Sequence, residues 1–289
     1  MKSTVIATVA LLWAVLPLGA QDMKVPSGCL PAEGAVASYE GYASRVVHQK
    51  TGIELVLVPA GTFTMGLVSR GECVPAHEVT IAKPFYIGKT EVTNGQYKKF
   101  IEESGYEGRP DVDPAYDLYL LHLRGKSIMP TGDDFPIVYV SWRNAKAFCQ
   151  WAENLDLPSE AEWEYCCRAG TRSIYAFGDD ASVYENYGWA STNSEGHPHQ
   201  VAQLKPNAWG LYDMHGNVCE WCLDDYIFRY DNAPTDGSAR YDNRMTKVLR
   251  GSGWSAGTDI NPAAVGFRQN SAPTNAGNDI GFRVVLRLP

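Results

Sequence analysis

Glycine and proline interrupt this chain so often that long regular elements have little room to form. The 289 residues include 27 glycines and 17 prolines, together with 8 tryptophans and 16 tyrosines. Because glycine and proline end helices and strands, this pattern is typical of short elements joined by many turns. With 45% hydrophobic and 20% charged residues, the composition is that of a globular chain able to bury a core.

Alternating apolar residues predict short strands in the first third of the chain. Residues 53–58 alternate as a strand does, and residues 60–66 carry the turn-and-return pattern of a hairpin. Residues 79–81 and 85–87 predict a second short strand pair. A long loop over 106–135 follows, and loops of this length in compact domains often have a function.

Three capped helices are expected between the strand-rich ends. Thr93-Asn94 caps a helix over 95–103 that Gly105 ends, and Ser141 caps a second helix from 142 to about 154. Ser159 and Glu162 form a capping box for a third. After Gly170 the chain predicts loops and short strands. We therefore expect a single α+β domain.

The first twenty residues predict a secretory signal peptide. Lys2 precedes a short apolar run from Val5 to Leu16, and Gly19-Ala20 supply small residues before a polar segment. The run is short for a membrane span. An uncleaved anchor, or a lipoprotein modified at Cys29, is the less favoured alternative. The organisation expected is a signal peptide at 1–20, a leader at 21–51 and a domain at 52–289. The protein would then be periplasmic or secreted, with no membrane span after cleavage.

The charge balance argues against a nucleic-acid partner. The formal net charge is −8, and removal of Lys2 with the signal peptide makes it −9. A protein that grips phosphates needs clustered basic side chains, which this chain lacks.

Seven cysteines make disulfides an expectation for an exported chain, and the odd number leaves at least one thiol unpaired. We expect Cys222 and one of Cys166 and Cys167 to be structural, with the pairing open. Cys219 and Cys222 form a C-x-x-C. A redox motif of this kind would normally open a helix after a strand, and a zinc site would need a second pair of ligands, so the sequence supports neither interpretation well.

A set of motifs in a fixed order carries a family resemblance. The motifs are Val58–Gly66, Lys89–Asn94, Phe135–Trp142, Leu157–Tyr165, Asn207–Trp221, Leu249–Trp254 and Asp279–Arg283. In this order they resemble the formylglycine-generating enzyme (sulfatase-modifying factor) family over about residues 52–287. The resemblance implies that family's variant of the C-type lectin fold, which is poor in regular secondary structure.

The resemblance also implies that the family's reaction is lost. The family's enzyme oxidises a substrate cysteine to formylglycine with O₂ and a copper ion held by two cysteines, and soft thiolates suit Cu(I). The two matching positions are Ala256 and Asn261, and Gly253 replaces a serine. We therefore expect no copper at the family site and no formylglycine generation. The sequence identifies no other redox cofactor.

A structural calcium site is the second feature that the resemblance implies. Its matching positions are Asp213, Gly216, Val218 and Glu220. Calcium takes carboxylate and carbonyl oxygens, which these residues can supply. The alternative is a hydrogen-bonded turn in which Glu220 accepts backbone N–H groups.

The remaining candidate residues surround the family's pocket. Arg268 retains the pocket arginine, Cys219 replaces a pocket tryptophan and Asp279 replaces an asparagine. Asp259 or Asp279 would act as base, and Arg268 would bind an anionic or carbonyl group, unless it belongs to a buried ion-pair network. Cys219 is a candidate nucleophile or a disulfide partner.

Trp254 and Ser252 are the candidate substrate-binding residues. For two other motifs we expect no functional role. His197 and His199 are expected to be exposed to solvent rather than to bind a metal. Asp224 and Asp225 are expected to form a solvated pair.

Two functions remain open from the sequence. The first is an exported tailoring enzyme, an oxidase in the maturation of a secreted peptide siderophore such as pyoverdine. Export, length and the lost copper cysteines are similar to a pyoverdine-maturation type of family member. The second is a lectin-like binding module without catalysis, acting on a peptide, glycan or partner protein. The oligomeric state stays open.

Overall fold

The computed structural model describes residues 23–67, 71–108, 117–257 and 264–289. The predicted signal peptide, Asp259 and Asn261 lie outside these residues. No helix of the described part is long and apolar enough to cross a membrane.

Short strands and short helices make up the fold, as the glycine and proline pattern predicts. The strands are β1 (Cys29–Pro31), β2 (Arg45–His48), β3 (Glu54–Val58), β4 (Gly61–Met65), β5 (His77–Ile81), β6 (Phe85–Gly88), β7 (Cys219–Asp225), β8 (Lys247–Arg250), β9 (Gln269–Ser271), β10 (Ile280–Gly281) and β11 (Val285–Arg287). The helices are α1 (Asn94–Ser104), α2 (Leu118–Leu123), α3 (Trp142–Ala152) and α4 (Glu160–Arg168), with 3₁₀ turns at Tyr39–Gly41, Gly71–Cys73 and Ala181–Asn186. The α+β class is confirmed.

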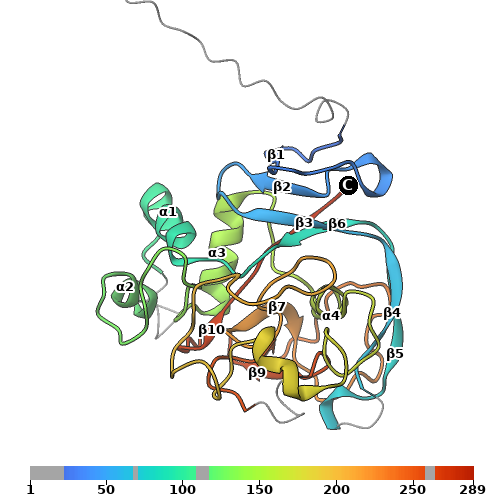
Figure 1. Ribbon diagram of the computed structural model, residues 1–289. Helices are drawn as coiled ribbons and strands as arrows, with labels where there is room; N and C mark the ends of the chain where they lie inside the picture. The colour runs from blue at the N-terminus through green and yellow to red at the C-terminus, as the bar shows by residue number, and fades with distance from the viewer. Residues whose placement is uncertain (1–22, 68–70, 109–116, 258–263) are drawn as a thin grey trace, which may run out of the picture.

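The strands form three sheets. A five-stranded sheet has the order β1-β2-β3-β6-β11, a four-stranded sheet the order β10-β7-β8-β9, and β4 pairs with β5 alone. In Figure 1 the first sheet lies above the second, with α3 beside them and α1 and α2 on the outer flank. Strands from both ends of the described chain meet in the first sheet.

Two expected strand pairings are wrong, although the strands themselves are present. β4 does not return onto β3: it pairs with β5, while β3 lies between β2 and β6. The expected pair over 79–81 and 85–87 is split between two sheets. β3 is buried at four of its five positions, so both faces of this strand are covered, whereas the first four residues of β4 alternate between half-buried and exposed.

All three predicted helix starts are confirmed, because each depends on contacts within one turn. Thr93, Ser141 and Ser159 each accept a hydrogen bond from the backbone N–H three residues ahead, and the side chain at that position accepts in return. Gly105 ends α1 at φ +65°, a conformation that glycine adopts easily. The loop expected over 106–135 contains α2.

The described part of the segment expected as a leader, residues 23–51, contributes β1 and β2 to the first sheet. β2 pairs with β3 in antiparallel register, and Ala43 and Val46 are fully buried in the main core. His48 joins the segment to the residues that follow α3, through a 2.7 Å contact between its Nε2 and Asn154 Oδ1.

Aromatic side chains fill the space between the first sheet and the helices. The Tyr97 and Phe148 rings stack with centroids 5.8 Å apart, and Phe282 meets Phe148 edge-on at 5.4 Å. Such pairs stabilise a core beyond the area they bury.

All seven cysteines are buried free thiols in this structure. The disulfides expected for an exported chain are therefore not present in it, and Cys166, Cys167 and Cys222 are buried in the core.

Candidate functional site

Three segments meet at the start of β7. Cys219 opens this strand beside β10, and its backbone N–H donates to the Asp279 carbonyl over 2.7 Å. Gly253 lies against Asp279 so closely that an added Cβ would be 3.0 Å from the Asp279 Cβ. Here the structure brings together Cys219 and Asp279, two of the predicted site residues.

Trp254 and Ser252 complete this predicted group. The Trp254 backbone N–H donates to Asn217 O over 2.7 Å, and its indole Nε1 donates to Asn278 O over 3.1 Å. Ser252 is buried beside Gly253 at φ +66°. We call Cys219, Ser252, Trp254, Asp279 and Tyr139 the β7 site.

Tyr139 is the member of the β7 site that sequence reasoning missed. Its backbone N–H donates to Gly277 O over 2.8 Å, two residues from Asp279, and its φ is +61°. Left-handed backbone is costly for a bulky residue and is concentrated at functional sites. The motif that contains Tyr139 was interpreted only as part of the family pattern, since sequence carries no signal for a positive φ at tyrosine.

Burial sets the protonation of the β7 site. It raises the pKa of the Asp279 carboxyl, and burial together with the nearby Asp279 raises the pKa of the Tyr139 phenol. Burial, assisted by Asp279 and Glu220, raises the pKa of the Cys219 thiol well above its usual range. Cys219 is therefore a neutral thiol, 3.8 Å from Gln269 Oε1. Asp279 is the member best suited to accept a proton.

Arg268 belongs to a buried ion-pair network. Its Nε and Nη2 donate to the two carboxylate oxygens of Glu160 over 2.6 and 2.7 Å, and its Nη1 donates to Ile227 O. The guanidinium also packs on the Tyr230 ring, with 4.1 Å to the centroid. With 3% of the residue exposed, Arg268 is not open to a substrate. Of the two readings left open, the structure supports the ion-pair network.

Asp224 and Asp225 are buried, so their interpretation as a solvated pair is wrong. Asp224 accepts from the Glu160 and Arg240 backbone N–H groups, and burial next to Glu160 raises its pKa to about 7. Asp225 pairs with Lys247 at 2.7 Å.

The two loop histidines are partly buried rather than solvated. The His199 ring stacks on Trp189 with centroids 3.7 Å apart, and His197 lies 4.8 Å from His199. His199 Nε2 is 2.9 Å from Ser194 O. No three His, Cys, Asp or Glu side chains in the described residues are arranged to hold a metal ion.

The two predicted calcium ligands with carboxylate side chains, Glu220 and Asp213, lie near Arg283. Glu220 accepts from Arg283 Nε and Nη2 over 2.6 and 2.7 Å and also from the Trp163 indole. Both Glu220 oxygens are thus already in use. Asp213 accepts from Ala202 N through Oδ2, while its buried Oδ1 has no hydrogen-bond partner.

Asp213 is therefore the position through which a cation would be held. Glu91 also lies near Arg283, and the positive charge of this guanidinium acts on Asp213, Glu91 and Glu220. Gly216 and Val218 would add only backbone oxygens. Calcium at this turn remains a prediction.

Replacing Asp213 with asparagine tests that prediction. Burial raises the pKa of Asp213 from 3.8 to about 6, so its contribution to stability is present at low pH and is lost as the pH rises through 6. Without calcium, Asp213→Asn should be more stable than the wild type by about 1–3 kcal/mol at pH 8 and equal to it near pH 4.

Calcium chloride should raise the thermal midpoint of the wild type at pH 8 more than that of Asp213→Asn, with magnesium chloride as the control for ionic strength. Equal midpoints with and without calcium would contradict the calcium prediction.

Comparison with known proteins shows the family to which the chain belongs. Residues 43–288 match the sulfatase-modifying factor enzyme 1-like domain, and the chain belongs to that family. It is 28% identical to the formylglycine-generating enzyme of Streptomyces coelicolor, covering 86% of this chain and 93% of that one. It is 30% identical to the inactive C-alpha-formylglycine-generating enzyme 2 of Bos taurus, over 80% of this chain and 87% of the relative.

Solved structures agree with this assignment. The structure of PvdO from Pseudomonas aeruginosa is similar, with 31% identity, a TM-score of 0.70, and coverage of 83% of this chain and 96% of that one. Treponema denticola variable protein 1, at 24% identity and a TM-score of 0.63, shares the fold. The expected family and fold are confirmed.

Proposed function

We propose that the protein is exported and acts in the maturation of a secreted peptide or peptide-like metabolite, as an oxidase for a peptide siderophore such as pyoverdine. The observation that carries the proposal is the β7 site. Cys219, Asp279 and Trp254 converge there, next to Ala256, where the resemblance expects the first copper thiolate. An alanine side chain cannot ligate copper, so the reaction differs from formylglycine generation.

The similarity to PvdO supports a role in the maturation of a secreted metabolite, since the two structures match over most of both chains. The predicted signal peptide supports a periplasmic or secreted location.

The arrangement of the β7 site suggests a role for each of its residues in an oxidation. Asp279, whose pKa burial raises, would take a proton from the substrate as the substrate is oxidised. Trp254 would form the apolar wall against which the substrate lies, and the Tyr139 phenol would donate a hydrogen bond to it. An oxidase removes two electrons and two protons from its substrate and passes them to dioxygen, which becomes hydrogen peroxide.

Replacement of Asp279 with asparagine is the test of this proposal. A strain without the gene should secrete a precursor two mass units heavier than the mature metabolite, and the wild-type gene should restore the mature mass. Asp279→Asn should convert the precursor about 100-fold more slowly or worse, as expected on loss of a general base. Mass spectrometry of the culture medium measures both species.

An exposed carboxylate provides the matched control. Asp231 forms only a surface pair with Arg229, so Asp231→Asn should restore the mature metabolite. Asp279→Asn should also keep the wild-type thermal midpoint. An unchanged secreted profile in the deletion strain, or normal conversion by Asp279→Asn, would refute the proposed oxidase.

The second candidate function, a binding module without catalysis, is favoured by the protonation of Cys219. A buried thiol with a raised pKa is a poor nucleophile, and Arg268 is committed to Glu160. Under this function the deletion strain would secrete an unchanged metabolite, and the purified protein would retain a peptide or glycan through Trp254.

A further inference from the structure

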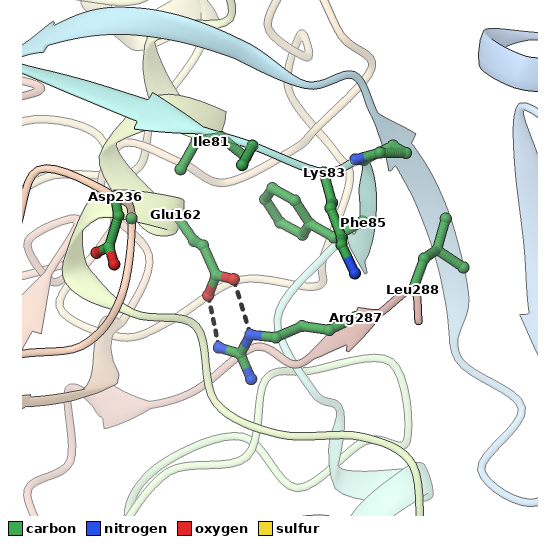
Figure 2. A pocket seen from close by; sticks show the side chains of 10 residues that line it. Ile81, Lys83, Phe85, Glu162, Asp236, Arg287 and Leu288 are labelled. Atoms are coloured by element: carbon green, nitrogen blue, oxygen red, sulfur yellow. Dashed lines mark hydrogen bonds and ion pairs between the residues drawn. The ribbon is translucent and has the colours of Figure 1, made fainter.

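A separate cavity lies on elements that the β7 site does not use. It has a volume of about 250 Å³, opens to solvent and is lined by the β5–β6 connection, α4, the loop at 236–237 and the end of β11. Figure 2 shows its lining side chains. No residue of the β7 site lines it. A cavity of this size accommodates a small organic group rather than an extended polymer.

The walls of the cavity are apolar. Ile81, Phe85 and Leu288 line it, and each is at most 8% exposed. In Figure 2 the Phe85 ring stands between Ile81 and the Lys83 side chain. A ligand that fills the cavity therefore gains free energy by removing apolar surface from water.

Two of the charged residues that line the cavity, Arg287 and Glu162, form an ion pair with each other. Arg287 Nε and Nη2 donate to the two oxygens of Glu162 over 2.8 and 2.6 Å, and Nη2 also donates to Leu157 O. Figure 2 shows this two-bond pair below the cavity. Both carboxylate oxygens of Glu162 are occupied, and the remaining nitrogen of Arg287, Nη1, lies 3.6 Å from Asp156 Oδ2. Both side chains are therefore already paired within the protein.

Lys83 differs from this pair. Among the described residues, none accepts a hydrogen bond from its ammonium or pairs with it, although it lines the cavity. Its side chain extends over the cavity toward Arg287 in Figure 2. The other charged lining residue is Asp236, whose Oδ1 accepts twice from Ser238, which lowers the pKa of the Asp236 carboxyl. The cavity thus offers one uncommitted cation beside an apolar chamber.

We propose that this cavity binds a carboxylate carried on a compact apolar group, with the apolar group between Phe85 and Leu288 and the carboxylate on Lys83. A free branched-chain acid and the C-terminal residue of an apolar peptide share this chemistry. The proposal is independent of the oxidase function.

The test uses three small probes on the full-length mature protein. The probes are 4-methylpentanoate, N-acetylleucine and N-acetylleucinamide, and binding is measured by calorimetry and amide chemical shifts. We expect at least one of the two acids to bind and the amide, which lacks the carboxylate, to bind about tenfold more weakly or worse. Binding of 4-methylpentanoate, with or without N-acetylleucine, indicates a free acid as ligand, and binding of N-acetylleucine alone indicates a peptide C-terminus.

Two variants and one control locate the site. Lys83→Gln should weaken acid binding about tenfold. Ala82→Trp places a large side chain at an exposed lining position and should abolish binding by filling the cavity. Lys126 is exposed and lies outside the cavity, so Lys126→Gln should bind as the wild type does.

Both test variants change exposed positions, and their thermal midpoints should match the wild type. The proposal is overturned if neither acid binds at up to about 10 mM, a range that reveals even millimolar affinity. It is also overturned if the amide binds as tightly as the acids, or if Lys83→Gln binds them normally.

Discussion

Arg268→Met should destabilise the protein by about 3–5 kcal/mol, the usual cost of removing one partner from a buried ion pair. After the substitution, the Glu160 carboxylate still accepts from Arg250 Nη1 over 3.3 Å and from the Tyr230 hydroxyl over 2.9 Å. Asp224 lies in the same network, and the guanidinium of Arg268 counteracts the rise of its pKa. Removing Arg268 therefore leaves two buried carboxylates with less positive charge between them. Urea unfolding of the purified variant measures the loss.

Two further variants separate this effect from catalysis. Arg172 is exposed and forms no ion pair within the described residues, so Arg172→Met should leave stability unchanged within about 0.5 kcal/mol. Adding Glu160→Gln to Arg268→Met should recover part of the loss, because the double substitution removes the unpaired charge as well. If Arg268→Met is as stable as the wild type but inactive, Arg268 binds substrate after all.

The sequence predicted the local parts of the fold and missed the parts that depend on distant contacts. Helix starts at Thr93, Ser141 and Ser159 were found because a cap and its partner lie three residues apart. The pairing of β4 with β5 was missed because a hairpin pattern looks the same whichever neighbour accepts the strand.

The same distinction applies to the candidate site. Cys219, Ser252, Trp254 and Asp279 were found through ordered motifs that the family shares, and the structure brings them together. Arg268 could not be assigned from the sequence, since its partner Glu160 lies 108 positions away. Tyr139 was missed because its positive φ follows from the packing of surrounding segments, which no local pattern records.

The charge of Arg283 makes the other large stability contribution, and it should show a pH dependence. Arg283 donates to Glu220 twice, to Gly88 O and to Tyr212 O, and its charge also faces Glu91 and Asp213. Arg283→Met should cost about 3–5 kcal/mol at neutral pH, because three buried carboxylates lose the cation that they share.

The direction in which pH changes the stability loss of Arg283→Met follows from the pKa values of Glu91 and Asp213. Burial already raises the pKa of Glu91 and of Asp213, and Arg283 opposes both shifts. In Arg283→Met the folded-state pKa values rise further above those of the unfolded chain. Groups of this kind favour folding at low pH and lose that contribution as the pH rises. The stability deficit of Arg283→Met should therefore be larger at pH 8 than at pH 5, as measured by urea unfolding at both values.

A surface pair supplies the control for this comparison. Arg229 pairs with Asp231 where both side chains are about half exposed, so Arg229→Met should cost less than about 1 kcal/mol at either pH. A deficit for Arg283→Met that is the same at pH 5 and pH 8 would show that Arg283 stabilises the fold by packing and hydrogen bonds alone. In that case the three carboxylates would be compensated by another positive charge, and the calcium predicted at Asp213 would be the first candidate to test.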